Sequence, residues 1–196
     1  PVDMGTVFHE TLEAFSRRLE ESEYDWKTLP REVADRWVEE CLDSLTVDYG
    51  NTVLNSTARN SYMVRRMKRI LKRTVWALGE QIRKGLFTPE NYEISFSSVS
   101  DLEAVNIELS PEEKLRLRGR IDRVDTCEDE NHVYVKVIDY KSGNTSFQLL
   151  SFYHGLQLQL VVYLNAAMEL MRQEHPGKEV VPAGVLYYQI QDPVLD

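Results

Sequence analysis

The sequence predicts an α/β protein with an N-terminal helical part and a mixed central sheet with flanking helices. Over roughly the first 84 residues, apolar side chains recur every three or four positions, the period of an amphipathic helix. After Gly85 and Pro89 the chain changes to short, β-branched, alternating segments separated by acidic and Asn clusters. A helical stretch from Phe147 to about Arg172 then precedes one last strand. This order indicates a helix that crosses over one face of the sheet.

Three helices are expected in the N-terminal part. The first begins near Met4, where Asp3 is placed to cap the first turn, and it carries His9. The second begins with Pro30 in the first helical position, where the missing amide proton costs no hydrogen bond. The third has its apolar face over residues 63–82 and its basic side chains around the outside.

Strand character marks four segments between residues 92 and 140, and we expect them to form an antiparallel meander. The segments are "YEISFSSV" (92–99), "AVNIEL" (104–109), "KLRLRGRIDRV" (114–124) and "VYVKVIDY" (133–140). The crossover helix is ended by "HPGK", and "AGVLYYQI" is expected to be the last strand.

Bulk composition favours a soluble protein of the cytoplasm. The longest apolar runs, such as Leu160 to Leu164, are far below the roughly 18 residues that a membrane span needs. The only two cysteines, Cys41 and Cys127, have no CxxC spacing, which argues against a disulfide scaffold and against a zinc ribbon. At 196 residues we expect one domain, with a helical part over about 1–88 and an αβ core over about 89–196. The chain starts in mid-pattern, so we expect a fragment of a larger protein.

Charge is strongly segregated along the chain. The net charge of −9 argues against a nucleic-acid partner, because phosphate binding depends on Lys and Arg. Residues 59–84, however, hold nine Lys or Arg and one Glu. This basic helix is either a solvated helix face, a track for a DNA backbone, or a docking surface for another domain or subunit.

Two acidic residues lie in the strand pair around "GRIDRVDTCEDENHVYVKVIDYK". If these strands are antiparallel, Asp122 and Asp139 converge, and Lys141 shares a face with Asp139 while Tyr140 points the other way. Paired carboxylates suit a hard divalent cation such as Mg²⁺, and the lysine adds a positive charge beside it. A structural alternative is that Arg120 and Arg123 neutralise Asp122 in an ion-pair network, which predicts no metal affinity.

Four separate motifs resemble one family. Asp122, sixteen further residues and then Asp139-Tyr140-Lys141 resemble the Asp...(Asp/Glu)-X-Lys signature of the restriction-endonuclease-like nucleases. The wider set is "GTVFHETLEAF", "GRIDRVD", "VIDYKSG" and "LQLQLVVYL". Together these motifs resemble a RecB-type nuclease domain of a bacterial ATP-dependent helicase-nuclease complex, over nearly the whole chain. The resemblance implies a restriction-endonuclease-like core and a single nuclease domain over 1–196.

The resemblance also implies a metal site and a reaction. The implied metal ligands are His9, Asp122, Asp139 and the main-chain carbonyl of Tyr140, with Mg²⁺ as the ion and Mn²⁺ as a substitute. Lys141 would orient or activate the attacking water, and the pair Gln159 and Tyr163, one helical turn apart, would position Lys141 or the DNA backbone. Glu93 is an expected supporting carboxylate or a ligand of a second metal. The implied reaction is DNA phosphodiester hydrolysis.

Partners follow from the same resemblance. The family implies DNA as substrate, a helicase/nuclease A subunit as heterodimer partner, and ATP used only by a helicase part or that partner. It also implies a 4Fe-4S cluster whose cysteines lie outside this chain, since Cys41 and Cys127 lack cluster spacing. The alternatives are a non-catalytic nuclease-like module, which is either a scaffold or a DNA-guiding domain, or an RNA substrate.

Overall fold

The computed structural model describes residues 4–48, 58–95, 106–108, 114–116, 119–143 and 159–191. The chain divides into two compact units. A helical unit contains residues 1–86 with 141–144 and 189–196, and a sheet unit contains residues 87–140 with 145–188.

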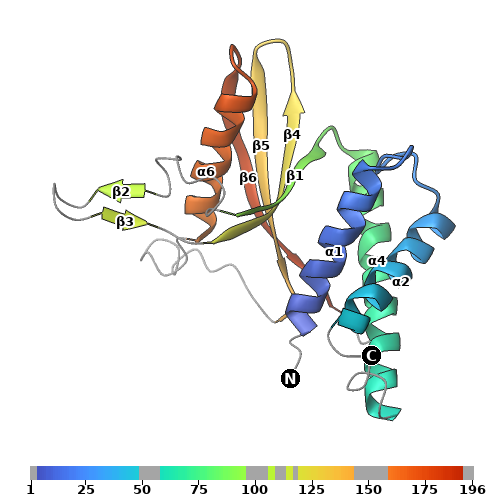
Figure 1. Cartoon of the computed structure of the whole chain (residues 1–196). Coiled ribbons are helices and arrows are strands. Elements are labelled where there is room, and N and C mark those ends of the chain that lie inside the picture. The colour runs from blue at the N-terminus through green and yellow to red at the C-terminus, as the bar shows by residue number, and fades with distance from the viewer. Residues whose placement is uncertain are drawn as a thin grey trace, which may run out of the picture. The chain divides into compact units, whose positions relative to one another are not determined.

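Three long helices form the helical unit (Figure 1): α1 (Met4–Glu20), α2 (Arg31–Asp48) and α4 (Ala58–Lys84). All three helices predicted for this part are confirmed. Phe15 of α1 lies close to two tryptophans, with its ring centre 5.6 Å from that of Trp26, between α1 and α2, and 6.3 Å from that of Trp37 of α2. Asp3, the expected cap of α1, lies outside the described residues. Of the described helices, none combines the length and the apolar character that crossing a bilayer requires.

A four-stranded sheet with the order β1-β4-β5-β6 forms the centre of the sheet unit. Its strands are β1 (Thr88–Ser95), β4 (Arg120–Glu128), β5 (His132–Lys141) and β6 (Glu179–Gln189). β1 and β5 both pair antiparallel with β4. β6 follows helix α6 (Gln159–Glu174) and runs parallel to β5, since the amides of Glu179 and Ile190 donate to the carbonyls of Asn131 and Lys141. The predicted mixed sheet with flanking helices is therefore confirmed.

The predicted meander is wrong in one respect. β2 (Asn106–Glu108) and β3 (Lys114–Arg116) pair with each other in a separate two-stranded sheet, so β1 lies directly beside β4. The segment 114–124, expected as one strand, is divided between β3 and β4. The apolar alternation continues through Gly119, so the period alone did not show where one strand ends and the next begins.

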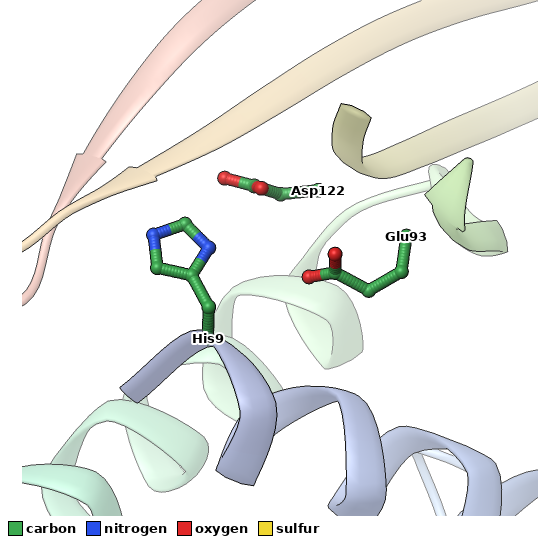
Figure 2. Close-up of side chains that lie close together, drawn as sticks. All are labelled: His9, Glu93 and Asp122. Atoms are coloured by element: carbon green, nitrogen blue, oxygen red, sulfur yellow. The ribbon is translucent and has the colours of Figure 1, made fainter. Parts of the chain in front are cut away.

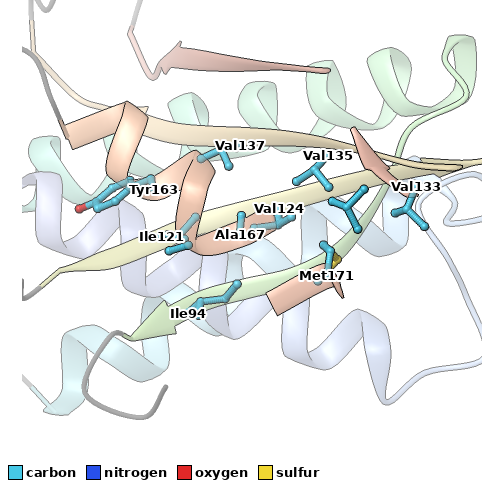
Figure 3. Packing of buried hydrophobic residues seen from close by; sticks show 11 residues of the cluster. Ile94, Ile121, Val124, Val133, Val135, Val137, Tyr163, Ala167 and Met171 are labelled. Carbon is cyan, nitrogen blue, oxygen red and sulfur yellow. The ribbon is translucent and has the colours of Figure 1, made fainter. Parts of the chain in front are cut away.

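The core of the sheet unit lies between the sheet and α6 (Figure 3). Val124 of β4 and Val137 of β5 form a backbone pair and are both fully buried. α6 contributes Tyr163, Ala167 and Met171 to the same apolar cluster. Fully burying one such aliphatic side chain contributes about 1.5–3 kcal/mol, so this layer is the main support of the strands.

The turn between β4 and β5 is organised by Asp129. Its carboxylate Oδ1 accepts the backbone N–H groups of Asn131 at 2.8 Å and His132 at 2.7 Å, and Oδ2 accepts the Tyr134 hydroxyl at 3.1 Å. The hydrogen bond from the Asn131 amide is the largest cause that lowers the pKa of Asp129, to about 2. An ionised Asp129 therefore fixes this hairpin, and with it the register of the strand pair.

Candidate active site

Two carboxylates face each other across the strands β1 and β4. The backbone pairs Tyr92↔Arg123 and Ile94↔Ile121 bracket the position at which Glu93 lies opposite Asp122. Carboxylate oxygens of Glu93 and Asp122 lie within 4.8 Å of each other (Figure 2). Like charges directly opposite in a sheet are destabilising, so this placement needs a cation or a structural partner.

Glu93 has an unusual backbone conformation. Its φ of 50° lies in the left-handed region, which is uncommon for a residue other than glycine and costs of order 1–3 kcal/mol. Its side chain is 6% exposed and forms an ion pair with Arg120 at 2.5 Å. A bulge between Pro89 and Asn91 shifts the register of β1 and so sets Glu93, rather than a neighbour, opposite Asp122.

Asp122 is buried and held by the neighbouring strand. The last backbone pair between β4 and β5 is Arg123↔Ile138. Beyond it, the N–H of Tyr140 donates to the Asp122 carboxylate at 2.6 Å. This hydrogen bond places Asp122 beside the predicted Asp139-Tyr140-Lys141 segment, as expected. Asp139 is buried as well, although its carboxylate does not belong to the set of close-lying ligand atoms that contains Glu93 and Asp122.

Arg123 does not neutralise Asp122. Its guanidinium binds both oxygens of Asp125, at 2.6 and 2.9 Å, and also donates to the Tyr140 hydroxyl at 3.1 Å. Lys136 forms a second ion pair with Asp125 at 3.0 Å. Burial alone would lower the pKa of Arg123, but Tyr140 and Asp125 raise it above its ordinary value. Arg123 therefore stays charged, and its pairing is satisfied within a buried cluster of its own.

Tyr140 links this ion-pair cluster to the acidic site. Burial raises the pKa of its phenol to about 12, so the hydroxyl is neutral at pH 7. The ring is 4% exposed and contacts Tyr188 of β6 edge-on, with ring centres 5.9 Å apart. A rigid Tyr140 holds its own backbone amide in place against Asp122.

Gln159 and Tyr163 lie in the first turns of α6. The amide of Gln159 donates to the Tyr163 hydroxyl at 2.6 Å, which is the contact expected of a pair one turn apart. Tyr163 is 6% exposed and belongs to the apolar cluster of the sheet unit. The tyrosine is thus anchored in the core, and the glutamine extends from that anchor toward solvent. Their roles toward Lys141 or DNA remain predictions.

His9 and Lys141 belong to the helical unit. His9 lies in the second turn of α1 and is half-buried. Lys141 is the last residue of β5, is half-buried, and its carbonyl accepts the N–H of Ile190 at 2.8 Å. The metal-ligand role of His9 and the catalytic role of Lys141 remain predictions.

The donor set of the sheet unit fits a hard divalent cation. Glu93 and Asp122 supply carboxylate oxygens at one place, and oxygen ligands are what Mg²⁺ and Mn²⁺ prefer. The residue pattern offers only weak grounds for including Glu93. The signals that identify it, its positive φ and the bulge before it, are properties of the backbone that no residue pattern reveals.

A second group of potential ligands was not predicted. His175 is only 18% exposed in its side chain and contacts Glu90 at 2.7 Å and Glu128 at 3.2 Å. Glu174 lies close to the same group, and burial raises its pKa. These contacts tie the C-terminal end of α6 to β1 and β4. They therefore account for this group as a structural connection at the end of the helix.

Comparison with known proteins identifies the family of this chain. The family model described as the PD-(D/E)XK nuclease superfamily matches residues 1–196. The chain belongs to this superfamily. Its mixed sheet with flanking helices is the restriction-endonuclease-like fold that the motifs predicted, and the opposed acidic residues lie on its neighbouring strands β1 and β4.

Relatives of this chain are named as the B subunit of an ATP-dependent helicase/deoxyribonuclease. The chain is 46% identical to the relative from Lachnoclostridium phytofermentans over 193 residues, which is 98% of the chain. It is 43% identical to that of Alkaliphilus oremlandii and 40% identical to that of Clostridium tetani, each over 193 residues and 98% of the chain. The chain spans only 16 to 17% of the length of these relatives.

Proposed function

We propose that this nuclease domain hydrolyses DNA phosphodiester bonds in a metal-dependent reaction. The observation that supports this most is the approach of Glu93 and Asp122 within 4.8 Å, with Asp122 held by the amide of Tyr140 in the Asp139-Tyr140-Lys141 segment. Two acidic residues in a buried, strained setting cost stability, and such costs are typical of functional sites.

Mg²⁺ is the proposed ion, with Mn²⁺ as a substitute. Asp122, Asp139, the carbonyl of Tyr140 and His9 are the proposed ligands, on the basis of the family resemblance and of the oxygen-rich donor set. When bound, such an ion polarises the scissile phosphate and lowers the pKa of a coordinated water. Glu93 would add a further carboxylate to this set.

The protein's own groups have separable tasks. The Tyr140 amide fixes the orientation of the Asp122 carboxylate through a hydrogen bond of 2.6 Å. Lys141 would orient the attacking water and stabilise negative charge that develops on the phosphate. Gln159, held by Tyr163 at 2.6 Å, would position Lys141 or the DNA backbone.

The process we propose is exonucleolytic trimming of DNA ends during recombinational repair. The relatives are named as the B subunit of a helicase/deoxyribonuclease. On that basis a helicase/nuclease A subunit in the cytoplasm would deliver the strand and use the ATP. A 4Fe-4S cluster with cysteines outside this chain would belong to the full-length protein.

Cleavage of a labelled single-stranded oligonucleotide in Mg²⁺ tests the proposal. We expect cleavage by the wild-type chain, and its loss in Asp122→Ala and in Lys141→Ala with unchanged far-UV circular dichroism. Glu179→Ala and Lys84→Ala remove the same charges from side chains that are 75% and 78% exposed and should cleave normally. Cleavage retained in both site variants would contradict the assignment.

A non-catalytic module is the second candidate, and the ion pair between Glu93 and Arg120 is the observation that favours it. In that case the acidic residues are structural and bind no metal. Calorimetric titration of Mn²⁺ into the wild type and into Asp122→Ala separates the two functions. Saturable binding that the variant lacks supports the nuclease, and no binding in either protein supports the structural module.

A further inference from the structure

A basic groove runs between helices α2 and α4 of the helical unit. Its volume is about 680 Å³. Six of its nine lining residues are Lys or Arg and two are acidic, so the groove is strongly positive in a chain of net charge −9. The ninth lining residue is Trp76. A local cationic surface on an acidic protein points to an anionic ligand.

Three arginines form a row along one edge of this groove. Arg65, Arg69 and Arg73 are four residues apart, so each lies one turn, about 6 Å, further along α4. All three side chains are exposed. Like charges at this spacing destabilise a helix by roughly 0.2–0.5 kcal/mol per pair, so the row is not explained by the stability of α4.

The lysines of the groove differ from Arg65 and Arg73 in their pairing. Lys68 forms an ion pair with Asp43 at 2.7 Å, and Lys72 forms one with Glu39, which fastens α4 to α2. Among the described residues, no carboxylate forms an ion pair with Arg65 or Arg73. These two arginines therefore keep their charge available for a ligand, whereas the charge of the lysines is already paired within the fold.

Trp76 provides an aromatic surface at the end of the row. It follows Arg73 by three residues and is 42% exposed, which is unusual for so large an apolar side chain. The guanidinium of Arg31 lies 5.6 Å from its ring centre. A second cavity of about 250 Å³ adjoins Trp76 and is lined in part by Leu29 and Val75. Cations next to an exposed ring and an apolar pocket suit a ligand with both phosphates and flat bases.

We propose that the groove binds a single nucleic-acid strand, with phosphates along Arg65, Arg69 and Arg73 and a base stacked on Trp76. The choice of DNA as that strand rests on the proposed function. The proposed binding to the groove does not rest on that function, because Asp122 and Glu93 are not among the groove residues. An acidic peptide would satisfy the arginines but would leave the exposed tryptophan unexplained.

Binding of a fluorescein-labelled oligothymidylate in EDTA tests the proposal without cleavage. For Arg65→Ala/Arg69→Ala/Arg73→Ala, we expect weaker binding and a slope of log affinity against log salt that is smaller by about 2, since each strand phosphate contact contributes roughly 0.7. Trp76→Ala should bind roughly 5- to 150-fold more weakly. Lys27→Ala/Lys84→Ala/Arg172→Ala removes the same charge from exposed positions outside the groove and should leave the slope unchanged.

Two results would overturn the inference. One is a triple-arginine variant that binds the oligonucleotide with the affinity and slope of its charge-matched control. The other is displacement of the oligonucleotide by polyglutamate together with normal binding by Trp76→Ala, which would assign the groove to an acidic protein partner. The binding assay in EDTA separates this inference from the proposed function, because it reports on the groove variants whether or not the chain cleaves DNA.

Discussion

Replacing Asp122 by Asn should stabilise the metal-free protein and abolish its response to metal. The substitution keeps the size of the side chain and an oxygen that accepts the Tyr140 amide, which lies 2.6 Å from the carboxylate. It removes only the negative charge opposite Glu93. The change therefore isolates the electrostatic cost of the paired carboxylates from their packing.

The size of that cost follows from the separation of the two carboxylates. Two unit charges at the upper limit of this separation, 4.8 Å, repel by about 3.5 kcal/mol at an effective dielectric constant of 20. The ion pair of Glu93 with Arg120, which is 46% exposed, and the surrounding solvent offset part of this. We expect Asp122→Asn to gain roughly 1–2 kcal/mol without metal, which raises Tm by about 2–8 °C for a protein of this size.

Bound metal should reverse the order of the melting temperatures of the wild type and of Asp122→Asn. A ligand present at 100 times its Kd stabilises the folded state by about 2.7 kcal/mol, or roughly 5–11 °C in Tm. The wild type should show this shift in Mn²⁺ and the variant should not. Thermal unfolding followed by circular dichroism, in EDTA and in Mn²⁺, measures both effects, with the exposed substitution Glu179→Gln as control.

Either of two results would refute this reasoning. If Asp122→Asn melts below the wild type in EDTA, the carboxylate is a structural acceptor whose charge is fully compensated. If the variant keeps the whole Mn²⁺ shift, the metal binds elsewhere. The Glu90, Glu174 and His175 group would then be the place to examine next.

Two further predictions concern stability. Among the described residues, Arg123→Met leaves only Lys136 as a cation paired with the buried Asp125, so urea unfolding should show a free energy of unfolding lower by about 3–5 kcal/mol. The exposed Arg172→Met is the control, and a loss below about 1 kcal/mol would contradict the buried network. Asp129→Asn should lower Tm at pH 7. Because the folded pKa of Asp129 is depressed to about 2, its stabilisation is present above about pH 4 and disappears as the pH falls toward 2. A difference in Tm that stays constant over that range would refute the assignment.

The sequence predicts the helices well because each buries one continuous face. Phe8, Phe15 and Leu19 of α1 recur at helical spacing and all are buried. The strand boundaries were harder to predict, since alternation continues from β3 through Gly119 into β4, although the two strands belong to different sheets. Pairing between distant strands depends on register and twist, which a local period does not contain.

The acidic site could be predicted only in part, for the same physical reason. Asp122 was selected from its motif, and the Tyr140 amide donates to its carboxylate, but its role in the site stays a prediction. Glu93 lies in a segment with ordinary strand composition, and its position depends on a bulge earlier in the same strand. The pairing of Arg123 with Asp125 was missed because the two residues lie two apart on one strand, and proximity to Asp122 in sequence suggested the wrong partner.

The two carboxylates can stay close together because many other interactions fix the strands of the sheet unit. Glu93 has a backbone conformation that costs about 1–3 kcal/mol, and its charge lies opposite that of Asp122. Against this, the valine core fixes β4 and β5, and the Asp129 turn fixes their register. In a less tightly packed sheet, the backbone of Glu93 would relax to an unstrained conformation. The stability of the fold is thus what keeps two acidic groups close enough to share one cation.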